Sequence, residues 1–339
     1  MAEERKRILT GDRITGKLHL GHYVGSLQNR VKLQEEYETY IIMADVQALT
    51  THFEHPEMIK RALVEVALDY LAVGLDPEIA TILVQSQVPE IAELTVLYSM
   101  FVPVSHLQKN PTIKSEAEQY GYKSLNYGFL GYPVSQAADI TFCKAHLVPV
   151  GEDQLPHIEQ TRRIVRKFNQ LYQPIFPEPE ALVGSTSRLM GLDGQAKMSK
   201  SLGNAIMLSD DSKTVKEKIR QAKTDPARIH KDDPGHPEVC VVYQYHKIFN
   251  PEGYQEVEES CREGTIGCVA CKKRLTKVLN SFLDPMRDRR SYYEERIPLV
   301  QEILQEGTKE ARKVARKTMA EVREAMQIDY FADKMSLTD

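Results

Sequence analysis

Two short segments, far apart in the chain, carry side chains that could handle phosphates. The first, His19-Leu20-Gly21-His22, follows the apolar run Arg7–Thr10, which predicts a strand, and a helix is expected to begin where the segment ends. Free N–H groups at a helix start favour a phosphate. His19 and His22 are three residues apart, so on a helical turn both could donate hydrogen bonds to phosphate oxygens. Taken alone the pattern is weak, because either histidine could be structural.

The second segment is Lys197-Met198-Ser199-Lys200-Ser201, in a loop rich in Gly and Ser near residues 185–205. Two lysines on a loop can neutralise the charge that develops on a triphosphate. A lysine pair by itself is usually a solvated surface. Together with the upstream histidines it indicates chemistry on a nucleoside triphosphate.

The elements that must position these segments alternate between strand and helix. Apolar runs predict strands at Arg7–Thr10, Tyr40–Ala44, Ala80–Gln85 and Leu147–Val150. Helical spacing predicts helices at Leu20–Glu36, Pro56–Val73, near Ile91–Met100 and at about Gln154–Asn169. This alternation is typical of an α/β fold with a Rossmann-like parallel sheet.

Beyond about residue 205 the pattern becomes helical and rich in Lys, Glu and Arg, as in Lys309–Met326. We therefore predict a catalytic domain at 1–190, the lysine loop at 191–205, and an all-helical domain at 206–339.

The composition is that of a folded, water-exposed protein. The chain has 339 residues, 42% hydrophobic and 27% charged, which excludes a fully disordered chain. Mean hydropathy is −0.41 and no long apolar run occurs, so no membrane span is expected. The charged N-terminus lacks an apolar leader, which predicts a cytoplasmic location. A net charge of −4 argues against coating nucleic acid non-specifically but allows a local basic face.

Four of the five cysteines form one group in the sequence: Cys240, Cys261, Cys268 and Cys271, with Cys143 apart. Four thiolates suit a 4Fe–4S cluster or a tetrahedral Zn²⁺ site. The alternative is a set of buried, reduced cysteines, since Cys packs well in protein cores.

The two phosphate-handling segments resemble the signatures of class I aminoacyl-tRNA synthetases. The resemblance is closer to the tryptophanyl-tRNA synthetases, through Thr15–Tyr23, Tyr132–Ile140 and Val148–Gln154, and runs nearly end to end. It implies a Rossmann-like domain followed by a helical domain, a homodimer, and activation of L-tryptophan with ATP and Mg²⁺ before transfer to tRNA(Trp). Such chemistry needs charge stabilisation and positioning more than a protein nucleophile.

The resemblance also implies which residues act. His19, His22, Lys197 and Lys200 would be catalytic. The ATP site would comprise Arg13, Ile14, Thr15, Gly21, His22, Gly151, Glu152, Asp153, Leu189, Lys197, Met198, Ser199, Lys200 and Ser201, with Mg²⁺ held by phosphates and water. The tryptophan site would comprise Leu9, Gly11, Tyr132, Gln136, Asp139 and Gln154. Tyr132, Gln136 and Asp139 have the spacing of one helix face, and Asp139 would accept the indole N–H.

Tyrosine is the alternative amino acid, because Tyr-x-x-x-Gln-x-x-Asp also resembles tyrosyl-tRNA synthetases. Gln136, Arg13 and Gln47 depart from the usual tryptophanyl pattern. The run Val148–Gln154 and the complete lysine segment favour tryptophan. Two other classes of protein remain open: a small-molecule nucleotidyltransferase, and a regulatory synthetase-like protein that binds RNA or senses redox state.

A subset of tryptophanyl-tRNA synthetases carries four similarly spaced cysteines that hold a 4Fe–4S cluster. On that resemblance we favour 4Fe–4S over Zn²⁺ here. A basic run, Lys272–Arg274, follows the last cysteine. We hypothesise that the cluster stiffens a surface that contacts the tRNA anticodon.

Overall fold

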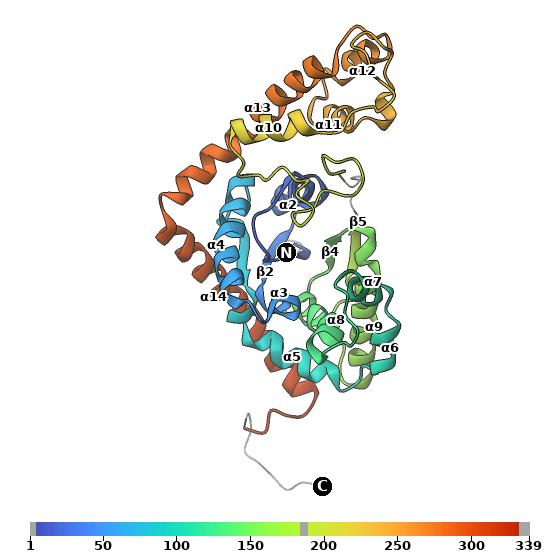
Figure 1. Cartoon of the computed structure of the whole chain (residues 1–339). Helices are drawn as coiled ribbons and strands as arrows, with labels where there is room; N and C mark the ends of the chain where they lie inside the picture. The colour runs from blue at the N-terminus through green and yellow to red at the C-terminus, as the bar shows by residue number, and fades with distance from the viewer. Residues whose placement is uncertain (1–4, 184–188, 332–339) are drawn as a thin grey trace.

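The core of the molecule is a parallel sheet of five strands (Figure 1). In the computed structural model, which describes residues 5–183 and 189–331, the strands lie in the order β3-β2-β1-β4-β5. Their bounds are β1 Arg7–Arg13, β2 Glu38–Ala44, β3 Ala80–Val84, β4 Leu147–Val150 and β5 Glu180–Val183. All neighbouring pairs are parallel, which confirms the predicted Rossmann-like α/β fold.

Helices connect the strands and cover both faces of the sheet. Before β3 these are α1 Leu20–His22, the π-helical turn η1 Tyr23–Leu27, α2 Gln28–Glu36, α3 Asp45–His52 and α4 Pro56–Val73. After β3 come η2 Gln85–Gln87, α5 Pro89–Ser99, α6 Val104–Lys109, α7 Pro111–Gln119, α8 Tyr127–Thr141, η3 Glu152–Gln154 and α9 Leu155–Leu171. Successive β2 residues alternate between two apolar cores: Ile41 belongs to one and Ile42 to the other.

The C-terminal helices form a separate layer beyond the sheet and then return to it. They are α10 Ser212–Gln221, η4 Pro237–Val239, α11 Val241–Phe249, α12 Tyr254–Arg262, α13 Cys268–Glu294 and α14 Ile297–Ala325. Figure 1 shows α10–α13 at one end of the molecule and α13 running back toward α4.

The last helix, α14, packs on the catalytic core although it falls within the predicted helical domain. The hydroxyl of Thr308 accepts a hydrogen bond from the N–H of Val84 on β3 at 3.1 Å. Gly307 lies so close to the sheet that a Cβ there would be 2.2 Å from the carbonyl oxygen of Ile82. The domain division at 1–190, 191–205 and 206–339 stays a prediction, and its outer ends and residues 184–188 lie outside the described residues.

Most predicted elements are found, with differences at their ends. The helix Pro56–Val73 and the strand Leu147–Val150 have the predicted bounds, whereas β1 continues to Arg13. The predicted helix Leu20–Glu36 contains a π-helical turn. Strand β5 was not predicted. Within the described residues, no helix is long and apolar enough to cross a membrane.

Candidate active site

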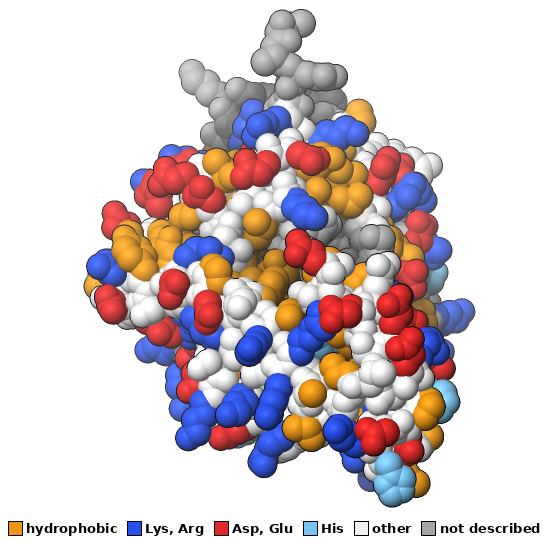
Figure 2. All heavy atoms as spheres, turned by 90° about the horizontal axis from the view of Figure 1, so that it is seen from above, with side chains coloured by type: hydrophobic (Ala, Val, Ile, Leu, Met, Phe, Trp, Pro, Cys, Tyr) orange, Lys and Arg blue, Asp and Glu red, His pale blue; other side chains and the backbone are white. Residues whose placement is uncertain are grey.

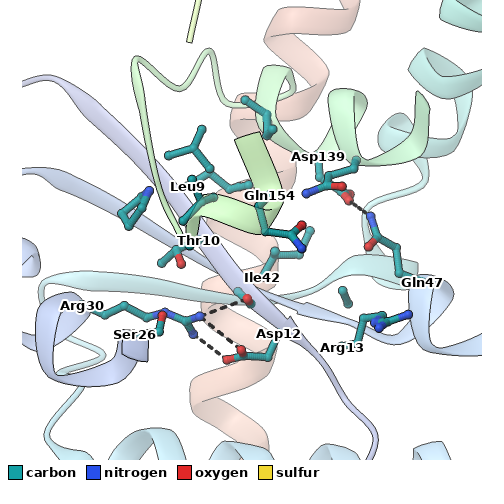
Figure 3. Close-up of a pocket in the computed structure, with 18 of the residues that line it drawn as sticks. Leu9, Thr10, Asp12, Arg13, Ser26, Arg30, Ile42, Gln47, Asp139 and Gln154 are labelled. Atoms are coloured by element: carbon teal, nitrogen blue, oxygen red, sulfur yellow. Dashed lines mark hydrogen bonds and ion pairs between the residues drawn. The ribbon is translucent and has the colours of Figure 1, made fainter. Parts of the chain in front are cut away.

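A cavity of about 320 Å³ opens at the carboxyl ends of β1 and β4 (Figure 3). The strand order reverses between these strands, and this is where ligands bind in open α/β sheets. All six residues predicted for the amino-acid site line this cavity: Leu9, Gly11, Tyr132, Gln136, Asp139 and Gln154. Arg13 and Gly151, predicted for the ATP site, also line it.

Gly11 is required by the close approach of β1 to β2. A Cβ at this position would lie 2.0 Å from the carbonyl oxygen of Ile42. Any side chain would therefore push the two strands apart below the cavity.

Asp139 is a buried carboxylate that two glutamines hold in place. Nε2 of Gln85 donates to both carboxylate oxygens, at 2.7 and 2.9 Å. Nε2 of Gln47 donates to Oδ2 at 2.7 Å (Figure 3). Burial raises the pKa of Asp139 to about 7, although the glutamine hydrogen bonds lower it. Gln85 was not predicted from the sequence, and Gln47 was predicted only as a departure from the family pattern.

The wall around Tyr132 is built from α7, α8 and α9. The hydroxyl of Tyr132 lies 2.9 Å from Nε2 of His157, and Arg13 forms an ion pair with Glu116 at 3.5 Å. Burial, with the nearby charge of Glu116, raises the pKa of Tyr132 far above its ordinary value. Tyr132 is therefore a neutral hydrogen-bonding group at the cavity, and Glu116 and His157 are site residues that spacing did not reveal.

A buried ion pair between Arg30 and Asp12 also lines the cavity. The guanidinium of Arg30 contacts both oxygens of Asp12, at 2.6 and 3.2 Å, and the carbonyl oxygen of Gly11 at 3.0 Å (Figure 3). The hydroxyl of Tyr70 donates to Asp12 at 2.6 Å. Burial alone would raise the pKa of Asp12, but Arg30 outweighs it and lowers the pKa to about 2.

The segment Leu18–His22, here called the catalytic turn, brings the two histidine rings together. Their centroids are 3.8 Å apart, and the N–H of His19 donates to Nδ1 of His22 at 3.2 Å. Burial, with neighbouring positive charge, lowers the pKa of His19 to about 3 and that of His22 to about 4. Both rings are thus neutral at pH 7. Nδ1 of His19 is buried and has no hydrogen-bond partner among the described residues.

The lysine loop packs directly on the catalytic turn. The N–H of Gly21 donates to the sulfur of Met198 at 3.3 Å, and Nζ of Lys200 donates to the carbonyl oxygen of Gly16 at 3.2 Å. The contact also requires glycine at position 21, because a Cβ on Gly21 would lie 2.9 Å from the His19 ring and 3.3 Å from Met198.

The remaining residues predicted for the ATP site are distributed around this contact. Lys197 pairs with Met190 in a short β-bridge, the backbone of Leu189 accepts from the N–H of Met198 at 3.0 Å, and the hydroxyls of Ser199 and Ser201 are 2.9 Å apart.

Ile14 is fully buried and lines a groove between α4 and α14 instead of the cavity. The N–H of Thr15 turns back to the carbonyl oxygen of Arg13 at 3.0 Å, and Glu152 is exposed. The side chain of Asp153 lies outside what the structure describes.

The four cysteines of the C-terminal region come together at the start of α13. Burial first, and then the charges of Cys240, Cys261 and Cys268, raise the pKa of Cys271 to about 12. The described part of the chain nevertheless contains no group of three or more His, Cys, Asp or Glu side chains arranged to hold a metal ion. The structure therefore does not support the predicted 4Fe–4S cluster.

The parallel sheet, the histidine turn at the end of β1 and the lysine loop packed on it define a class I aminoacyl-tRNA synthetase. Residues 1–284 match the family of class I tRNA synthetases for W and Y, and the chain belongs to this family.

Comparison with individual proteins places the chain among the tryptophanyl-tRNA synthetases. It is 52% identical to a tryptophan–tRNA ligase of Clostridium longisporum, covering 96% of this chain and 97% of that one. It is 49% identical to the tryptophan–tRNA ligase of Lactococcus lactis, covering 96% and 98%. The crystal structure of tryptophanyl-tRNA synthetase from Campylobacter jejuni with ADP and tryptophan superposes with a TM-score of 0.87, at 32% identity over 95% of this chain and 99% of that one.

Proposed function

We propose that the cavity binds L-tryptophan and that the catalytic turn and lysine loop bind ATP beside it. The observation that carries this proposal is Asp139, a fully buried acceptor that lines the cavity at the switch point of the sheet. An indole N–H satisfies this acceptor. Phenylalanine has no donor to offer, so its binding would leave the carboxylate short of a partner, which is costly.

In the first step a carboxylate oxygen of tryptophan attacks the α-phosphorus of ATP. The bond from that phosphorus to the bridging oxygen breaks, and pyrophosphate leaves with the electron pair. Neutral His19 and His22 donate hydrogen bonds to phosphate oxygens, while Lys197 and Lys200 stabilise the negative charge that develops. In the second step a terminal hydroxyl of tRNA(Trp) attacks the carbonyl carbon of tryptophanyl-AMP, and AMP leaves.

Mg²⁺ fits this proposal as a companion of ATP. Phosphate oxygens and water would coordinate the ion, as they commonly do for Mg²⁺ bound with a nucleotide. When bound, the ion would screen the charge on the phosphates.

Amino-acid-dependent exchange between ATP and pyrophosphate tests the proposed function. We expect exchange with tryptophan and none with tyrosine or phenylalanine. Exchange with tyrosine alone would favour the tyrosyl alternative, and absence of exchange with every amino acid would indicate a non-catalytic relative.

A 4Fe–4S cluster held by Cys240, Cys261, Cys268 and Cys271 is a further part of the proposal. Its support is that the four thiols lie within electrostatic reach of one another, with Nη1 of Arg228 3.8 Å from the sulfur of Cys261. Iron and sulfide analysis of anaerobically purified protein, with Cys271→Ser as the comparison, tests it, and stoichiometric zinc would favour the alternative metal.

The proposed partners are tRNA(Trp) and a second copy of the chain. Figure 2 views the molecule from the α10–α13 end, where Lys and Arg side chains gather along one margin, and the run Lys272–Arg274 lies on α13. Val96, Met100 and Val104, on and beside α5 and α6, are exposed apolar side chains that a homodimer would cover. Light scattering in solution tests the dimer. A cytoplasmic location is proposed because ATP, tryptophan and tRNA meet there.

A further inference from the structure

A buried ionic cluster outside the cavity joins α13 to the catalytic turn. Its centre is Asp69 on α4, which has no exposed surface. Oδ2 of Asp69 accepts the backbone N–H of Leu18 at 2.7 Å, and Oδ1 accepts from Nη1 of Arg290 on α13 at 2.6 Å. Leu18 is the residue directly before His19, so one carboxylate links the helical layer to the catalytic histidines.

Arg290 is itself held in a fixed orientation. Its Nη2 donates to Glu65 at 2.5 Å and its Nε donates to Glu294 at 2.7 Å, and only 6% of its side chain is exposed. Burial raises the pKa of Asp69 to about 6, while the charge of Arg290 opposes that rise. Arg290 thus favours the ionised carboxylate, which is the stronger acceptor for the Leu18 N–H.

The same helix also holds the other side of the turn. The carbonyl oxygen of Leu18 accepts the N–H of Leu208 at 3.0 Å, and the N–H of Leu20 donates to Ile206 at 2.9 Å. This neighbouring segment ends at Asp210, whose carbonyl oxygen accepts from Nε of Arg287 at 2.9 Å. Arg287 and Arg290 are one helical turn apart on α13. One helix therefore supports both chain segments beside the histidines: Leu18 through Asp69, and the segment 206–210 through Asp210.

We propose that Asp69 and Arg290 are positioning residues for amino-acid activation: through the N–H of Leu18 they set where the rings of His19 and His22 stand against the phosphates. The inference rests on the proposed function of this site. Neither residue touches the reacting atoms. A stabilising role alone would not require the pair, since well-packed apolar residues commonly replace a buried ion pair without loss of stability.

The test compares four variants of the full chain by tryptophan-dependent pyrophosphate exchange and by thermal unfolding. Arg290→Met cuts the link, Arg290→Lys keeps the charge, and the double variant Asp69→Leu with Arg290→Met replaces the pair by apolar groups. Arg289→Met is the matched control, because Arg289 also bonds α13 to α4, through the carbonyl oxygen of Ala72 at 2.7 Å, but has no link to Leu18.

We expect kcat for exchange to fall by about 10- to 100-fold in Arg290→Met and in the double variant, the scale seen when reacting groups are misplaced by about 1 Å. KM for tryptophan should stay within about twofold, because the pair lies outside the lining of the cavity. Arg290→Lys should recover part of the rate, and Arg289→Met should keep the wild-type rate. The double variant should unfold at a higher temperature than Arg290→Met while remaining slow.

Recovery of both rate and melting temperature in the double variant would overturn the proposal, because the pair would then serve stability alone. Hydrogen exchange of the Leu18 amide gives a readout independent of catalysis: the double variant should lose protection there, and retained protection would also overturn the proposal. If the wild-type protein showed no tryptophan-dependent exchange, the proposed function would fail, while the Leu18 amide would still report whether the pair holds the turn.

Discussion

Replacing Asp139 by Asn should remove much of the selection for tryptophan. Asp139 is 3% exposed, and its carboxylate already accepts hydrogen bonds from Gln85 and Gln47. Its two oxygens can accept one further hydrogen bond, which the indole N–H would supply. An Asn at this position has one acceptor oxygen and a donor NH₂ group that cannot receive a hydrogen bond. The lost charged hydrogen bond is worth about 1.5 to 3 kcal/mol, which corresponds to roughly 10- to 150-fold in kcat/KM.

The same residue should also make KM for tryptophan depend on pH. With a pKa of about 7, Asp139 is mostly ionised at pH 8 and mostly protonated at pH 6. Because the ionised form is the better acceptor, KM for tryptophan should rise by about tenfold as the pH falls from 8 to 6. In Asp139→Asn the same profile should be flat.

Asp45 offers a control for the electrostatic part of the argument. Its charge contributes to the raised pKa of Asp139, and its own Oδ1 accepts from the N–H of Ser86 at 2.9 Å. Asp45→Asn should therefore shift the KM profile to lower pH without lowering the plateau affinity. Steady-state pyrophosphate exchange across this pH range measures both variants. A KM that is independent of pH in the wild type, or full tryptophan specificity in Asp139→Asn, would show that ionised Asp139 does not select the amino acid.

Three other predictions concern groups next to the cavity. Arg30→Met should destabilise the fold by about 3 to 5 kcal/mol, because it leaves Asp12 buried without its partner. Urea unfolding measures this change in the free energy of unfolding. A loss below about 1 kcal/mol would mean that water reaches Asp12. The pKa of Asp12 is lowered in the fold, so its stabilising contribution is present above its ordinary pKa of 3.8 and is lost as the pH falls toward 2. Acid unfolding followed by circular dichroism should therefore show a smaller pH dependence in this range in Arg30→Met than in the wild type. Lys200→Met should lower kcat for exchange about 100-fold with little change in KM for tryptophan, and an unchanged kcat would remove Lys200 from the proposed mechanism.

The sequence predicted the fold where local signals agreed with the tertiary structure. The bounds of α4 were clear because Pro56 begins the helix and Gly74, with φ of 101°, ends it. The strand β5 was not predicted because Glu180–Val183 is short and has no fully buried residue, so it lacks an apolar pattern. The π-helical turn at Tyr23–Leu27 likewise has no signature in residue spacing.

The amino-acid site was predicted from motifs, whereas its supporting contacts were not. Tyr132, Gln136 and Asp139 share one helix and therefore have readable spacing. Gln85 and Asp139 are 54 residues apart, and Asp69 and Arg290 are 221 apart. Such pairs are set by how strands and helices pack, and one sequence carries no periodic signal for them.

Aminoacylation of tRNA is the direct test of whether this protein joins tryptophan to tRNA(Trp). Purified protein would be given ATP, labelled tryptophan or labelled tyrosine, and transcripts of tRNA(Trp) or tRNA(Tyr), and acid-precipitable label would be counted. We expect charging for tryptophan with tRNA(Trp) alone. Charging of tRNA(Tyr) with tyrosine, or no charging of any pair by protein that binds ATP, would contradict the proposed function.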